Sequence, residues 1–122
     1  MYIAVYGTLK KDNHNHPLIE KSEFIGHSKV YGYQMYCIGN MTYGHGYPYI
    51  VPEISDKEIP IEVYKVDSNT AQMVDYLEIG YSKETVIVDV DGKKYPVSIY
   101  IVNEKNSRFK MDKPIESNTW EI

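Results

Sequence analysis

The stretch that decides the fold is "AVYGTLK", residues 4–10, in which a β-prone apolar run ends at Gly7. A glycine at this point lets the backbone take a positive φ or lets another group approach closely. Bare N–H groups in such a turn also form a concave site for anions. The simpler interpretation is a tight turn between a strand and a loop. This short segment leaves both interpretations open, and the rest of the chain has to separate them.

Length, charge and cysteine content limit the class of protein. The 122 residues fit a single domain, 1–122, with one core. The net charge is −4 and the 13 Lys and Arg are scattered, which argues against a nucleic-acid partner. Cys37 is the single cysteine, and no run approaches the roughly 18 apolar residues of a membrane helix. Since "MYIAVYG" also lacks the basic flank of a secretory signal, we expect a cytoplasmic protein that contacts no membrane.

Alternation of apolar and polar residues, the period of a β-strand, predicts most of the chain to be sheet. Asp91-Gly92 predicts a two-residue turn between the last two strands. The final dozen residues carry little pattern. The expected strands cover residues 2–6, 23–30, 31–38, a return at 49–51, 59–66, 84–90 and 94–102.

The clearest helix lies in "DSNTAQMVDYLEIG", residues 67–80. Asp67 or Ser68 is placed to cap its start, and Gly80 follows its end. The helical period predicts a buried apolar stripe of Met73, Val74 and Leu77.

A shorter helix of about two turns is predicted after the polar loop 10–15. Asn15 is expected to cap it, with Pro17 in its first turn. Leu18 and Ile19 supply its apolar contact.

Metal and nucleophile chemistry find little support in the residues. His14 and His16 stand two apart in a loop, unlike the i,i+4 pair of a helical zinc site, and one cysteine makes no thiolate cluster. The segment after the first strand lacks the spacing of a P-loop, and no GxSxG motif occurs. We therefore expect no metal and no other cofactor, which leaves acid–base chemistry by a carboxylate.

Glu78 is the carboxylate that stands out. It borders the predicted apolar stripe and lies in the last helical turn, where the macrodipole disfavours negative charge. Both effects raise a carboxyl pKa, so Glu78 is a candidate general base near neutral pH. Asp75 would add like-charge repulsion if it lies close. A solvated residue at a fraying helix end is the alternative that position alone leaves open.

Four short segments follow one another in a recognisable order: "YGTL" at 6–9, "NHPLI" at 15–19, "EVYKVD" at 62–67 and "DYLE" at 75–78. Together they resemble the γ-glutamyl cyclotransferase-like family. The resemblance spans most of residues 2–102. It implies an α+β fold, a small mixed β-barrel with short flanking helices, whose mouth brings the first loop and the helix with the Glu together.

The resemblance also implies a reaction. Characterised family enzymes release an amine or amino acid from a γ-glutamyl conjugate, because the substrate's own α-amine attacks the γ-carbonyl and forms 5-oxoproline. On that pattern Glu78 is the general acid and base. Tyr6, Gly7, Thr8 and Leu9 are the substrate-binding residues, and the N–H groups of Gly7, Thr8 and Leu9 would hold the α-carboxylate or a developing oxyanion.

Three positions depart from the family pattern, namely Tyr49, Ile61 and Ile79, where relatives often carry smaller residues. The bulk of Tyr49 and Ile79 is expected to narrow the cavity or redirect Glu78. Two hypotheses follow. The first is a small cyclotransferase acting on a γ-glutamyl small molecule, and the second is a non-catalytic barrel that binds a small anionic metabolite or a protein partner.

Overall fold

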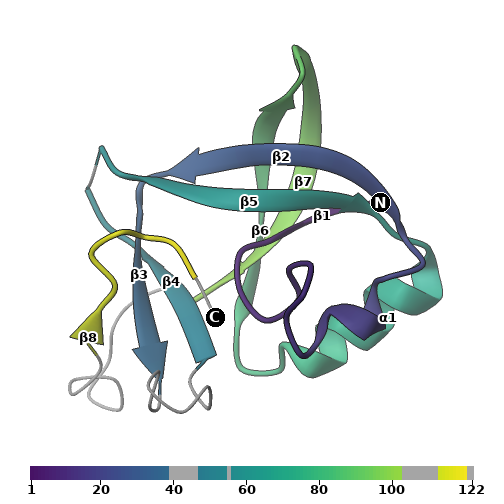
Figure 1. The fold of residues 1–122 in the computed structure, drawn as a ribbon, viewed down its shortest axis with the longest axis horizontal. Coiled ribbons are helices and arrows are strands. Elements are labelled where there is room, and N and C mark those ends of the chain that lie inside the picture. The colour runs from purple at the N-terminus through teal and green to yellow at the C-terminus, as the bar shows by residue number, and fades with distance from the viewer. Residues whose placement is uncertain (39–46, 55, 103–112, 121–122) are drawn as a thin grey trace.

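The structure is a computed structural model that describes residues 1–38, 47–54, 56–102 and 113–120. No helix within these ranges is both long and apolar enough to cross a membrane. Figure 1 shows the arrangement of the elements. In chain order they are β1 (Tyr2–Val5), η1 (His16–Leu18), β2 (Glu23–Tyr31), β3 (Tyr33–Ile38), β4 (Tyr47–Pro52), β5 (Glu58–Lys65), α1 (Ser68–Leu77), β6 (Ser82–Val90), β7 (Lys93–Ile101) and β8 (Lys113–Pro114).

Two sheets form the frame of the molecule. The larger has the strand order β2-β5-β1-β7-β6, and the smaller has the order β4-β3-β8. The strand β1 is central, antiparallel to β5 and parallel to β7. The strands curl into a half-barrel with β3 and β4 at one end and α1 at the other (Figure 1). The predicted α+β fold with a mixed, barrel-like sheet is confirmed, in the form of a half-barrel.

The strand β5 separates two apolar cores because its side chains alternate between the faces of the sheet. Ile59, Ile61 and Val63 belong to the core inside the half-barrel. Tyr64, and Val66 just after the end of β5, belong to the core that the sheet shares with α1. This assignment of faces agrees with the alternation in the sequence.

The helix α1 has a narrower buried stripe than its sequence predicts. The carboxylate of Asp67 caps its start by accepting a hydrogen bond of 2.7 Å from the N–H of Thr70. Within the helix only Ala71 and Val74 are buried. Met73 is 51% exposed and Leu77 is 41% exposed, so the predicted burial of these two residues is wrong. They lie on the flank of α1 that faces η1, where they line a groove and do not enter the core.

The predicted strands match the observed ones to within a few residues, and the Asp91-Gly92 turn is confirmed. Both turn residues have positive φ, 53° and 84°, as a two-residue hairpin turn requires. The alternation of residue types predicted no element in the C-terminal segment. Asn118 is fully buried there, its side-chain oxygen accepting from the N–H of Met35 and its amide donating to the carbonyl of Tyr33. Isolated side-chain hydrogen bonds of this kind produce no periodic pattern in the sequence, so the sequence did not predict them.

Candidate active site

A cavity of about 190 Å³ opens between the loop after β1, the start of β4 and the chain that follows α1. We call it the cavity below. Segment 6–9 lines one side, and Tyr47 and Pro48 of β4 line another. Glu78, at the C-cap of α1, completes the wall. The structure therefore brings all five residues singled out for a site, Tyr6, Gly7, Thr8, Leu9 and Glu78, to one place, and their roles stay a prediction.

Gly7 owes its identity to a close packing contact. Its φ is not positive, so that expected reason for a glycine is wrong. A Cβ atom on residue 7 would lie 2.4 Å from the Cγ atom of Pro48, a distance that real Cβ contacts essentially never show. The close approach is therefore made by the ring of Pro48, which seats the loop against β4.

The loop after Gly7 is held through its carbonyl oxygens. The carbonyl of Gly7 accepts from the N–H of Lys10, and the carbonyl of Thr8 accepts from the N–H of Asn15, each at 3.0 Å. The N–H groups of Gly7, Thr8 and Leu9 make no hydrogen bond within the described ranges of the chain. They are thus available to an anion in the cavity.

Asn15 supports this loop in a way the sequence did not predict. Its side-chain amide donates a 2.9 Å hydrogen bond to Oγ1 of Thr8, and no side-chain bond caps the following helix. The expected helix of about two turns is a single 3₁₀ turn, η1, with Pro17 in the predicted position. Asn15 lines the cavity beside Thr8, so it is a candidate site residue that sequence reasoning missed.

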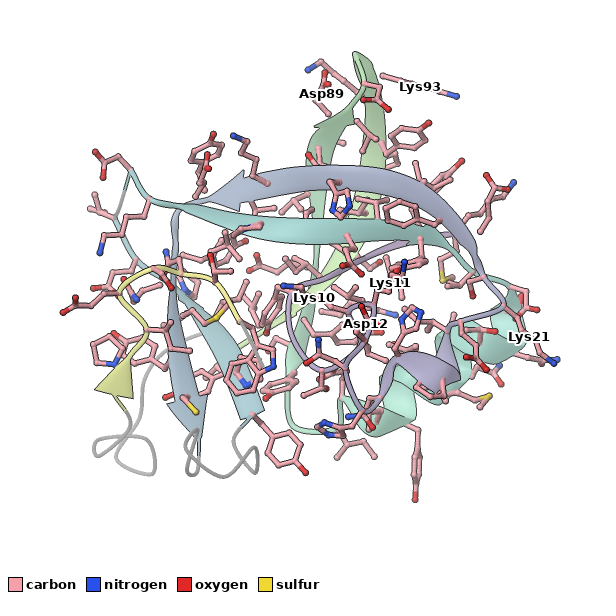
Figure 2. All side chains as sticks on the ribbon, in the orientation of Figure 1. Lys10, Lys11, Asp12, Lys21, Asp89 and Lys93 are labelled. Carbon is pink, nitrogen blue, oxygen red and sulfur yellow. The ribbon has the colours of Figure 1, made fainter. Side chains whose placement is uncertain are left out.

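A buried carboxylate, Glu62, anchors the same loop from β5. Glu62 is 7% exposed, and its Oε1 accepts from the N–H of Lys11 and from the hydroxyl of Tyr64, both at 2.9 Å. Figure 2 labels Lys10, Lys11 and Asp12 on the turn that this bond fixes. Glu62 belongs to the "EVYKVD" motif but does not line the cavity. It therefore acts as a positioning residue that holds the loop at Lys11.

The C-terminal segment holds the other side of the loop. Trp120 is 2% exposed, and its ring N–H donates to the side-chain oxygen of Asn13 at 3.2 Å. The ammonium of Lys10 donates to the carbonyl of Trp120 at 3.0 Å. Residues from both ends of the chain therefore shape the loop that lines the cavity.

Burial raises the pKa of Glu78 to about 7. The N–H of Glu78 bonds to the carbonyl of Val74 at 2.9 Å, which places its side chain at the end of α1, against the cavity. Its carboxyl group makes no hydrogen bond to another described residue. A carboxyl of this kind can hold or release a proton near neutral pH and is open to a ligand.

Asp75 does not act on Glu78 in the expected manner. It accepts from the hydroxyl of Tyr100 and from the ammonium of Lys83 at 3.0 Å, and these bonds, the one from Tyr100 first, lower the pKa of Asp75. The expected like-charge repulsion does not account for the pKa of Glu78, because burial is its cause. Asp75 instead fixes Tyr100, a residue of the cavity wall.

Tyrosines supply much of the remaining wall. The hydroxyl of Tyr6 donates to the carbonyl of Tyr100 at 2.8 Å, and that of Tyr81 donates to the carbonyl of Pro48 at 3.4 Å. Burial, with Glu78 nearby, raises the pKa of Tyr6 and Tyr81 above the usual value for tyrosine. These rings remain neutral, so Glu78 is the group of the described cavity wall whose carboxyl titrates near neutral pH. The sequence contains 13 tyrosines, and four of them line the cavity: Tyr6, Tyr47, Tyr81 and Tyr100.

The three residues that depart from the family pattern, Tyr49, Ile61 and Ile79, lie in different parts of the structure. Tyr49 is fully buried, stacks on Tyr36 with ring centroids 5.6 Å apart and does not line the cavity. Ile61 lies in the core inside the half-barrel. Ile79 does line the cavity, but it is 75% exposed. The expectation that Tyr49 narrows the cavity is therefore wrong, and the bulk of Ile61 is absorbed by the core.

Comparison with known proteins agrees with this geometry. The model of the family described as "Gamma-glutamyl cyclotransferase, AIG2-like" matches residues 3–122. The chain belongs to this family. Among curated members, MJ1514 of Methanocaldococcus jannaschii, named a putative gamma-glutamylcyclotransferase, is 35% identical over 109 residues, 84% of this chain and 85% of the relative. PH0828 of Pyrococcus horikoshii, named likewise, is 33% identical over 79 residues, 64% of this chain and 60% of the relative.

Solved structures of γ-glutamyl cyclotransferase-like proteins share the fold. The crystal structure of PH0828 superposes with a TM-score of 0.71 at 27% identity and covers 98% of this chain and 88% of that one. An AIG2-like protein of Mus musculus superposes with a TM-score of 0.75 at 22% identity and covers 95% of this chain and 86% of that one. At that identity the mouse protein supports the fold alone.

Proposed function

We propose that this protein is a cyclotransferase that releases an amine or amino acid from a γ-glutamyl conjugate and forms 5-oxoproline. One observation carries the proposal. The Glu78 carboxyl, with a pKa raised to about 7, lines the same cavity as segment 7–9, whose N–H groups bond to no described residue. The first is an acid–base group and the second is an anion site, and the reaction needs both.

A single carboxyl group can carry out the proton transfer that the reaction needs. The substrate's α-ammonium must lose a proton before its nitrogen attacks the γ-carbonyl carbon. When the new C–N bond closes the ring, the old amide C–N bond breaks, the leaving nitrogen takes up a proton, and the ring nitrogen loses its second proton to solvent. The Glu78 carboxylate would accept the first proton and return it to the leaving amine. A pKa near the working pH makes both transfers feasible.

The N–H groups of Gly7, Thr8 and Leu9 would hold the α-carboxylate or the developing oxyanion. Within the described lining of the cavity, Glu78 is the sole Asp, Glu, Lys or Arg, so backbone dipoles supply the attraction for an anion there. Five-membered ring closure is intramolecular, so positioning alone lowers much of the barrier. The site needs only to hold the glutamyl group in place and manage one proton.

The test is incubation with a panel of γ-glutamyl amino acids and amines, read for 5-oxoproline by mass spectrometry. We expect release from at least one conjugate in the wild type and none above background in Glu78→Gln. Binding of glutamate at the cavity with no 5-oxoproline from any conjugate would instead support a non-catalytic barrel for a small anionic metabolite.

A further inference from the structure

The ring of His16 holds the loop that lines the cavity, although His16 itself does not line it. The Nδ1 atom of His16 lies 2.9 Å from the carbonyl oxygen of Leu9. Because a carbonyl oxygen only accepts hydrogen bonds, Nδ1 must carry a proton and donate it. The acid–base step assigned to Glu78 makes no use of this bond, so the bond requires an explanation of its own.

The bond from His16 reaches Thr8 through two peptide groups of the loop. A trans peptide group is planar, and its N–H and C=O point in opposite directions. No described peptide bond is cis. The bond to the Leu9 carbonyl therefore also fixes the N–H of Lys10, which donates to the carbonyl of Gly7 at 3.0 Å. By the same geometry, the bond to the Gly7 carbonyl fixes the direction of the N–H of Thr8.

Asn15, the residue before His16, acts on the next peptide group. Its N–H donates to the carbonyl of Thr8 at 3.0 Å, which fixes the direction of the N–H of Leu9. The N–H groups of Thr8 and Leu9 bond to no described residue. Two adjacent residues therefore orient two N–H groups that are available to a ligand.

The position of the His16 ring is set by the core and not by the loop that it holds. Ile19, the C-cap of η1, is 1% exposed and belongs to the core that the sheet shares with α1. Its N–H donates to the carbonyl of His16 at 2.9 Å. The ring of His16 packs on the ring of Tyr64, with centroids 5.8 Å apart. Nδ1 is thus a fixed donor against which the loop is held.

We propose that His16 is a positioning residue for the anion site of segment 7–9, and that it orients the N–H of Thr8 toward a bound carboxylate or oxyanion by way of the Leu9 carbonyl. This inference rests on the proposed function for the identity of the ligand. His16 touches no substrate and takes no part in the proton transfer. The donor at Nδ1 is the feature that matters, and the aromatic character of the ring is not.

Two variants separate the donor from the ring. His16→Asn keeps an N–H donor near the place of Nδ1 and loses the ring, whereas His16→Phe keeps a ring against Tyr64 and loses the donor. The dissociation constant of 5-oxoproline is measured from the NMR shifts of the Thr8 and Leu9 amides. We expect His16→Phe to weaken binding several-fold, up to about tenfold, as the loss of one hydrogen bond does, and His16→Asn to stay within about twofold of wild type.

His27→Phe is the matched control. His27 is an exposed histidine of β2 whose ring packs on Phe24, so the same exchange of residue type should leave the dissociation constant unchanged. Binding that is weaker in His16→Asn than in His16→Phe would overturn the proposal, because ring packing would then be the part that His16 plays.

The protonation of the His16 ring gives a second readout that needs neither a variant nor a ligand. Long-range ¹H–¹⁵N NMR spectra of the wild type, recorded where the ring is neutral, should place the proton on Nδ1. A proton on Nε2 would overturn the proposal whatever the variants do.

Failure of the proposed function would look different. If glutamate or 5-oxoproline binds but no conjugate yields 5-oxoproline, the cyclotransferase assignment fails, and the comparison of His16→Phe with His16→Asn still decides the positioning role. If the wild type binds neither molecule, segment 7–9 is no anion site and the positioning role is overturned with it.

Discussion

Gly7 and Pro48 pack so closely that a Cβ atom on residue 7 would lie 2.4 Å from the Cγ atom of the proline. Gly7→Ala should therefore displace the loop and lower the free energy of unfolding by about 1–3 kcal/mol, as overpacking does. Urea denaturation measures the change. In a Pro48→Ala background the same substitution should cost much less, since Cγ and Cδ are gone. An equal cost in both backgrounds would show that contact with Pro48 is not the reason for the glycine.

Glu62 ties β5 to the loop through the N–H of Lys11 and the hydroxyl of Tyr64. Glu62→Ala leaves the N–H of Lys11 without this partner, so we expect a loss of about 1–3 kcal/mol of stability and a lower kcat/KM. Tyr64→Phe is the matched control. It removes one of the two bonds but keeps the bond to Lys11, so kcat/KM should stay close to wild type. A larger loss of activity in Tyr64→Phe would contradict a loop-anchoring part for Glu62.

Glu78→Gln should abolish turnover while the fold is kept. Gln matches the size of Glu but cannot accept the α-ammonium proton, so the acid–base contribution, about 10²–10⁴ in rate, is lost. Asp75→Asn is the control from the same helix, because Asp75 bonds to Tyr100 and Lys83, outside the acid–base step, and its effect should be much milder. Both are measured as kcat/KM for 5-oxoproline formation. Full activity in Glu78→Gln would remove Glu78 from the mechanism.

The raised pKa of Glu78 predicts a pH dependence of stability. The folded protein holds this proton more tightly than the unfolded chain does, because burial raises the pKa from 4.5 to about 7. The stabilisation that protonated Glu78 adds to the free energy of unfolding is therefore fully present below about pH 4.5. It declines as the pH rises toward about 7 and does not change above that pH. At about 1.4 kcal/mol per pH unit the decline amounts to about 3 kcal/mol.

Urea unfolding of the wild type and of Glu78→Gln across this range isolates that contribution, since other titrating groups cancel in the difference. The Gln variant should gain relative stability as the pH rises from about 4.5 to about 7. A difference that does not vary with pH would contradict a buried, protonatable Glu78.

The N–H groups of Gly7, Thr8 and Leu9, which bond to no described residue, predict an anion site. Titration with glutamate or 5-oxoproline should shift the amide NMR resonances of these three residues in a saturable way. The amide of Gly92, in the hairpin turn between β6 and β7, donates to Asp89 and serves as the internal control. Shifts confined to residues outside segment 7–9 would count against this assignment.

Local patterns in the sequence were sufficient for the strands, the capped helix α1 and the hairpin turn at Asp91-Gly92. Alternation of residue type, a capping carboxylate and a positive-φ turn all act within a few residues, so one chain segment carries the whole signal. The ordered motifs around Gly7 and Glu78 also led to the family. Burial of Glu78 was expected from its place beside the apolar stripe of the helix.

Only the tertiary structure decided which groups surround that helix end. Met73 and Leu77 have the spacing of a core stripe, but α1 meets the sheet along Ala71 and Val74, so the other two line the groove. The contacts of Gly7 with Pro48, and of Glu62 with Lys11, join segments far apart in the chain. Such contacts depend on how the strands curl and cross in three dimensions, so they cannot be predicted from the periodicity of the sequence.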